Sequence, residues 1–125
     1  MVDFQNGSLL KLKMVPKEKV EDSFSQLLIN GEYIISAYKS VRDTVVFTDK
    51  RIISLNVQGV TGKRKDYASL PYRRISAFSV ETSGVFDIDS ELEVWFAGVG
   101  KVRFEFTGRC DVSEISRIIA EKSLV

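Results

Sequence analysis

The residue types that carry most enzyme chemistry are nearly absent from this sequence. Its 125 residues include no histidine, the commonest general base and metal ligand, and a single cysteine, Cys110. One cysteine cannot build a structural zinc cluster, and Thr61-Gly62-Lys63 lacks the spacing of a phosphate-binding Walker loop. A reactive thiol at Cys110 is the alternative to a structural, partly buried cysteine, which is favoured without a histidine partner. The sequence thus nominates no catalytic, cofactor-binding or metal-binding residue and predicts that the protein is not an enzyme.

Acidic residues alternate along one short segment: Asp87, Asp89, Glu91 and Glu93. In an extended strand they would share one face, and such a stripe can hold a divalent cation. The segment does not fit a calcium-binding EF-hand loop, because Leu92 stands where the sharp-turn glycine belongs and Gly98 where the bidentate glutamate belongs. The favoured interpretation is an acidic, solvated strand edge that discourages wrong strand pairing.

A basic cluster forms a second candidate site. Lys63, Arg64 and Lys65 follow two glycines in a segment that is typical of a hairpin tip. Such a tip can bind an anion, because its cations donate charge-assisted hydrogen bonds to phosphates, but an ordinary exposed turn is the favoured alternative. Each cation contributes about 1 kcal/mol at most at an anionic membrane, so we expect lipid binding to be weak or absent.

The distribution of charge is more informative than its total. A net charge of +1 argues against a nucleic-acid-binding protein. Residues 1–75 carry 13 Lys and Arg against 8 Asp and Glu, whereas residues 76–125 carry 5 against 9. Opposite patches could favour head-to-tail self-association, unless folding interleaves the two halves and cancels their fields.

Apolar runs give no sign of a membrane span or an export signal. No stretch approaches the roughly 18 apolar residues of a spanning helix. Lys11 and Lys13 interrupt the apolar segment 9–14, which therefore does not read as a signal peptide. Together with the lone cysteine, these features lead us to expect a cytoplasmic protein.

Periodicity predicts a mainly β (α+β) domain. Residues 1–14 show no clear periodicity and are set apart as an N-terminal extension to a single domain over 15–125. A helix is expected from Pro16 to Asn30-Gly31, and a second helix from Asp111, whose N-cap role is supported by Glu114 three residues on. Between them, about seven strands are expected over 33–39, 44–48, 51–57, 65–70 and 74–82 and in a final pair that carries 92–96 and 102–106.

The final pair also predicts a register. Leu92, Val94, Phe96, Val102, Phe104 and Phe106 should share the buried face. The shortest connecting loop that allows this pairing comprises the three residues 98–100. The resulting register places Trp95 opposite Arg103 on the outer face, in cation–π contact. It also opposes Glu93 to Glu105, which is an unfavourable like-charge pair.

Several segments together resemble the bacterial pleckstrin-homology (PH) domain family, formerly a domain of unknown function. The likeness runs from about residue 15 to the end and rests on short elements in the right order. They are Arg42-Asp43, Phe47-Thr48, Lys50-Arg51, Gln58-Gly59, Thr61-Gly62-Lys63, Pro71-Tyr72 and Phe78–Thr82. The resemblance implies a PH-like barrel of two orthogonal antiparallel sheets with a C-terminal capping helix.

The resemblance also implies a non-catalytic binding module that assembles into rings, plausibly pentamers. Polar residues that match the family pattern form the candidate partner or oligomer surface: Arg42, Asp43, Thr61, Lys63, Glu81, Asp87, Asp89 and Glu91. We therefore expect a cyclic homo-oligomer that mediates protein–protein interaction with an unidentified partner and binds neither nucleic acid nor cofactor. A peripheral module for anionic lipid or phosphate is the alternative. For the subunit contact we expect residues 87–93 on one side and cations among Arg42, Lys50, Arg51 and Lys63 on the other.

Overall fold

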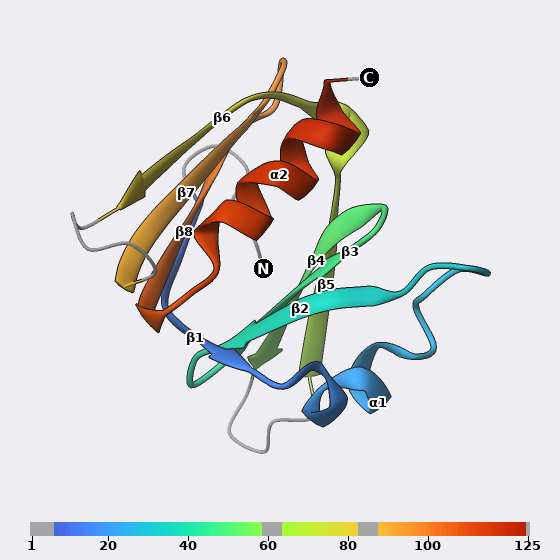
Figure 1. Cartoon of the computed structure of the whole chain (residues 1–125). Helices are drawn as coiled ribbons and strands as arrows, with labels where there is room; N and C mark the ends of the chain where they lie inside the picture. Colours follow the sequence, from blue (N-terminus) through green and yellow to red (C-terminus); the bar gives the residue numbers. More distant parts are fainter. Residues whose placement is uncertain (1–6, 59–63, 83–87, 125) are drawn as a thin grey trace.

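The computed structural model describes residues 7–58, 64–82 and 88–124 (Figure 1). Among these residues, no helix has both the length and the apolar character needed to cross a membrane. Thr61, Lys63 and Asp87 from the candidate surface lie outside the described ranges.

Eight strands form one continuous curled sheet, a half-barrel. The first antiparallel meander comprises β2 (Ile34–Lys39), β3 (Asp43–Thr48), β4 (Arg51–Gln58) and β5 (Arg64–Pro71). The second comprises β6 (Ile75–Thr82), β7 (Ile88–Phe96) and β8 (Gly100–Arg109). Helix α2 (Val112–Ser123) lies between the two halves and packs on β6 and on the 3-10 helix η2 (Tyr72–Arg74) (Figure 1). The predicted PH-like barrel with a C-terminal helix is confirmed, with eight strands rather than seven.

The additional strand is β1 (Gly7–Val15), which joins the two meanders. It lies between β2 and β8, antiparallel to β2 and parallel to β8, so the sheet is not antiparallel throughout. A bulge between Leu9 and Leu12 gives β1 one extra residue and places Lys11 at a φ of 57°. Since Leu9 and Leu12 are both buried three positions apart, the bulge breaks the alternation by which a strand is recognised. The structure thus places residues 7–14 inside the sheet, where the sequence pattern indicated an extension.

The N-terminal helical segment is shorter than its apolar stripe predicted. It comprises the 3-10 helix η1 (Lys17–Lys19) and one α-helical turn, α1 (Glu21–Phe24). Val20 and Phe24 are buried as expected, but Leu27 is partly exposed and its carbonyl accepts a hydrogen bond from Arg51 Nη2 at 2.7 Å. Residues 25–27 follow α1 as a turn, in which the amides of Leu27 and Leu28 both donate to Phe24 O.

Two apolar clusters stabilise the sheet, one on each side of β3 and β4. The larger cluster fills the space between the sheet and α2 and includes Tyr38, Phe47, Phe104, Phe106 and Ile115. The smaller cluster, which includes Phe24, Val46 and Ile53, lies beneath α1 on the opposite side. Because β3 and β4 are covered on both faces, residues 44–48 and 52–55 are buried at every position, including the polar Thr44, Thr48 and Ser54.

The last hairpin has the predicted faces, but its predicted register is wrong by two residues. Phe96 pairs with Gly100 around a tight loop at 97–99, and Val99 N donates to Phe96 O at 3.0 Å. Trp95 therefore lies opposite Lys101, whose Nζ is 5.8 Å from the ring centroid, and not opposite Arg103. The observed register pairs Glu93 with Arg103, and Glu105 lies opposite Glu91 instead of Glu93.

Candidate binding site

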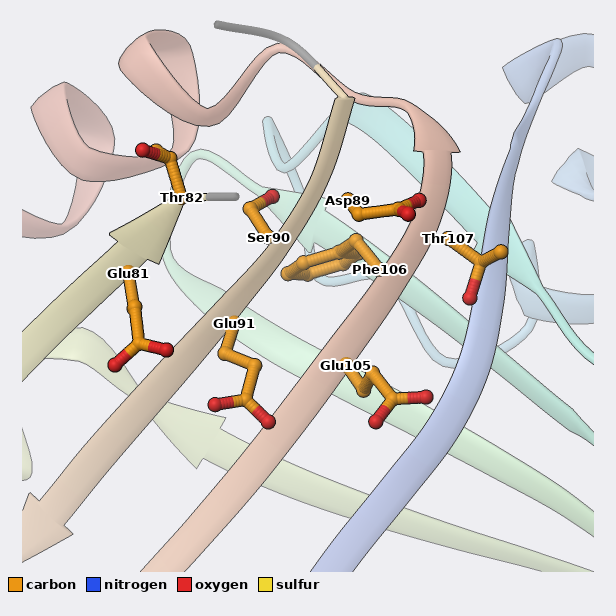
Figure 2. A pocket seen from close by; sticks show the side chains of 8 residues that line it. All are labelled: Glu81, Thr82, Asp89, Ser90, Glu91, Glu105, Phe106 and Thr107. Atoms are coloured by element: carbon orange, nitrogen blue, oxygen red, sulfur yellow. The ribbon is translucent and has the colours of Figure 1, made fainter. Parts of the chain in front are cut away.

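Three glutamates form a row across the outer face of the second meander. Glu81 on β6 pairs in register with Glu91 on β7, and Glu91 pairs in register with Glu105 on β8. Figure 2 shows the three side chains side by side on adjacent strands. Like charges that are directly opposite in a sheet are unfavourable, so the folded chain tolerates this acidic row at a cost in stability.

Arg103 partly neutralises the acidic row. Its Nη2 lies 3.2 Å from Glu91 Oε1 and 3.6 Å from Glu105 Oε2. Glu93 lies two residues after Glu91 on the same face of β7, and its Oε2 forms an ion pair with Lys101 Nζ at 2.8 Å. Glu81 at the edge of the sheet forms no ion pair with any residue in the described ranges and is exposed. The negative charge of the row is therefore least compensated at β6.

The row borders an open hollow of about 310 Å³ at the beginning of β7. Asp89 lies at its rim with a positive φ of 42°, and its Oδ1 accepts a hydrogen bond from Gly108 N at 2.6 Å. Ser90 and Phe106, which pair across β7 and β8, also line the hollow (Figure 2). Among the described residues, no group of three acidic, cysteine or histidine side chains is arranged to hold a metal ion. Four carboxylates, those of Glu81, Asp89, Glu91 and Glu105, thus line the hollow.

The structure divides the candidate surface into two parts. Glu81, Asp89 and Glu91 lie together at the hollow. Arg42 and Asp43 lie at the β2–β3 hairpin, with β2 and β1 between them and β8. Asp43 Oδ1 accepts from Asn56 Nδ2 at 2.7 Å, and Arg42 Nη1 donates to Val57 O at 3.1 Å, so both also hold the hairpin against β4.

The candidate anion-binding tip lies close to that hairpin. Arg64 and Lys65 begin β5 and are exposed, whereas Lys63 lies outside the described residues. Lys65 lines a hollow of about 320 Å³ together with Lys39, Val41 and Arg42. The first hairpin and the later basic tip, which are far apart in sequence, therefore contribute cations to one side of the molecule.

Sequence reasoning missed the contribution of β1 to this basic side. Lys11 and Lys13 join Lys39 and Arg42 around a second open hollow of about 600 Å³. The alternation Leu10-Lys11-Leu12-Lys13 was the available signal for a strand, but the bulge buries Leu9 together with Leu12 and leaves Leu10 exposed. We call Lys11, Lys13, Lys39 and Arg42 the basic patch.

Comparison with known proteins agrees with this architecture. The family model described as Bacterial PH domain matches residues 3–123. The uncharacterized protein YjqA of Bacillus subtilis (strain 168) is 40% identical over 119 residues, which cover 94% of this chain and 95% of that protein.

Two crystal structures share both sequence and fold with the chain. A DUF1696 family protein with a pleckstrin-homology domain from Shewanella loihica PV-4 is 36% identical, with a TM-score of 0.77 over 92% of this chain and 99% of the other. A pleckstrin homology domain from Shewanella amazonensis SB2B is 42% identical, with a TM-score of 0.65 over 89% and 90%. The chain belongs to the bacterial PH domain family.

Proposed function

We propose that this protein is a non-catalytic binding module that assembles head to tail into a ring and offers the acidic row to a protein partner. The observation that carries the proposal is the acidic row, which becomes least compensated where it reaches the edge of the sheet at β6. The PH fold is typically that of a binding module, and carboxylates line the hollow beside the row.

Complementary sheet edges support head-to-tail assembly. In the described residues, β6 pairs only with β7, and β5 pairs only with β4, so each leaves one edge unpaired. The beginning of β5 carries Arg64 and Lys65, and the end of β6 carries Glu81. If β5 of one copy were added antiparallel to β6 of the next, the basic beginning would meet the acidic end, and both unpaired edges would be covered.

Arg51 is bonded within the chain. It donates to Glu32, Ser69 and Leu27, so our proposal does not rely on it for the subunit contact. Arg64 and Lys65 take its place in the proposal, because they are exposed on the edge strand.

Mass in solution, measured by light scattering at low and moderate salt, tests assembly. We expect a cyclic oligomer, plausibly a pentamer, that Glu81→Lys dissociates and that the charge swap Glu81→Lys with Lys65→Glu restores. Glu121→Lys, which makes the same change on exposed α2, is the matched control and should leave the mass unchanged. A monomer at micromolar concentration under both conditions would rule out the ring.

Partner binding is tested separately from assembly. A native-cell pull-down with the wild type is repeated with Glu91→Gln, which removes one charge from the middle of the row and leaves the edges of the sheet intact. Loss of a captured protein with retention of the oligomer supports docking on the row. Equal capture by both forms would place the partner elsewhere.

A further inference from the structure

The sheet opens where β1 leaves β8. The last pair between these strands in the described residues joins Leu12 to Phe106, and after it β1 pairs with β2 alone, over 13–15. Pro16 has no amide proton to offer β2, and the chain then turns into η1, so residues 34–36 of β2 have no partner on β1. Figure 1 shows β1 crossing from β8 to β2 below the start of α2. The two halves of the sheet therefore separate at this end.

An open hollow of about 510 Å³ lies at this separation. The end of β1 and the beginning of β2 line one side of it, and the end of β8 and the start of α2 line the other. Its volume lies in the range that accommodates small-molecule ligands. The hollow belongs to the central strands, whereas the proposed ring contact uses the edge strands β5 and β6, so an inference drawn from it is independent of the ring.

One hydroxyl group in the lining has no partner. Ser36 Oγ is shielded from solvent, and no described group forms a hydrogen bond with it. Cys110, the other uncharged polar side chain in the lining, is 3.8 Å from the Tyr38 hydroxyl. A buried hydroxyl without a partner lowers stability, and a ligand that bonds to it recovers that loss. The Ser36 hydroxyl is therefore available to a ligand that enters the hollow.

Charged side chains of both signs surround the opening. Lys17 and Arg109 contribute two cations, and Asp111 and Glu114 contribute two carboxylates. None of the four forms an ion pair with a described residue. Asp111 Oδ1 accepts from Glu114 N as the cap of α2, which leaves its second carboxylate oxygen for another donor. Such a rim is complementary to a ligand that carries both a negative and a positive group.

Apolar surface completes the lining. Met14 is 42% exposed although it lies directly opposite the buried Tyr38 on β2. Ile35 is partly buried and also faces the hollow. The flexible methionine side chain can adjust to apolar groups of different shape. A ligand with an aliphatic portion would therefore gain contact area here.

We propose that this hollow binds a free amino acid with an apolar side chain. The α-carboxylate would accept hydrogen bonds from the Ser36 hydroxyl and the Arg109 guanidinium. The α-ammonium group would face the carboxylates of Asp111 and Glu114, and the side chain would pack against Met14. Inorganic phosphate fits poorly, because it would meet the same two carboxylates without a positive group of its own.

Isothermal titration calorimetry on the full-length chain tests the proposal, with L-leucine and L-methionine as probes. We expect both to bind, and glycine to bind roughly tenfold more weakly or less, because it lacks the apolar side chain. N-acetyl-L-leucine lacks the ammonium group and L-leucinamide lacks the carboxylate, so each should also bind roughly tenfold more weakly than L-leucine. These two compounds also represent the ends of a peptide, and they distinguish a free amino acid from a chain terminus.

Two variants locate the site. Ser36→Ala should weaken L-leucine binding roughly tenfold without lowering the melting temperature, because its hydroxyl forms no hydrogen bond in the free protein. Arg109→Gln should weaken binding by a similar factor. Ser79→Ala on β6 and Arg117→Gln on α2 make the same changes at exposed positions outside the hollow, and both should leave the affinity unchanged. Amide chemical-shift changes on binding should centre on residues 35–37 and 109–114.

Several results would overturn the proposal. They are absence of binding by both amino acids at millimolar concentration, equal binding of inorganic phosphate, and equal binding of either blocked leucine. Unchanged affinity in Ser36→Ala, or chemical-shift changes centred elsewhere, would place any bound amino acid at another site and would also overturn it. Because the proposed ring contact lies on other strands, light scattering on Ser36→Ala should show the same mass as the wild type.

Discussion

The guanidinium of Arg51 holds the carboxylate of Glu32 with two hydrogen bonds of 3.0 Å each, from Nε to Oε2 and from Nη2 to Oε1. The Glu32 side chain is fully buried, and Thr48 Oγ1 donates a third hydrogen bond to it at 2.6 Å. This pair connects the loop after α1 to the β3–β4 hairpin.

Removal of the arginine should therefore leave a buried carboxylate without its partner. Arg51→Met is expected to lower the free energy of unfolding by about 3–5 kcal/mol, measured by denaturant titration. Lys50→Met is the control, since Lys50 is exposed and its contact with Asp49 is 3.6 Å, and should change stability by about 0.5 kcal/mol or less. Equal costs for the two variants would contradict a stabilising role for the pair.

The same carboxylate should make stability depend on pH. Burial opposes ionisation of Glu32, but hydrogen bonds from Arg51, Thr48 and the Ile29 amide outweigh it and hold the pKa of Glu32 below its ordinary value of 4.5. Its contribution to stability is therefore fully present above pH 4.5 and is lost as pH falls through the lowered pKa of the folded state. The stability difference between wild type and Glu32→Gln should shrink steadily as pH falls below 4.5, and a difference independent of pH would refute this assignment.

Arg103 should matter most when salt is low. Arg103→Met removes the cation between Glu91 and Glu105 and leaves the acidic row uncompensated, which should cost about 1 kcal/mol at low salt and less at high salt. Adding Glu105→Gln should recover part of the loss, because it relieves the like-charge pair. A cost that is insensitive to salt would instead indicate lost packing of the arginine side chain.

The N-terminus of α2 depends on one side-chain cap. Asp111 Oδ1 accepts from Glu114 N at 3.1 Å, as the spacing predicted. Asp111→Ala should lower stability by about 1 kcal/mol, and Asp111→Asn, which keeps an acceptor oxygen, should lower it by less. Thermal melts of the three forms check this order.

The sequence predicted those features that local patterning determines. Alternation along β7 and β8 identified the buried face, and the Asp111 cap located the start of α2, because each depends on residues a few positions apart. The register of the last hairpin was wrong by two, since a shift of two leaves every side chain on the same face and the hydrophobic pattern cannot distinguish the alternatives.

The candidate site was less predictable because it is assembled from distant strands. Glu81, Glu91 and Glu105 are separated in sequence, and only the pairing of β6, β7 and β8 aligns them. The basic patch depended on recognising β1, in which the bulge at Lys11 disrupts alternation. Neither a propensity nor a short motif indicates which strand a bulged segment will join.

The central position of β1 also bears on how the chain folds. The two meanders form between neighbours in sequence, so each can assemble through short loops, whereas the β1–β8 contacts join residues almost a hundred positions apart. Closing that loop costs entropy that local contacts do not, and it cannot occur before β8 is present. We therefore expect the two meanders to form early in refolding. The slow step should be the pairing of β1 with β8, which joins them.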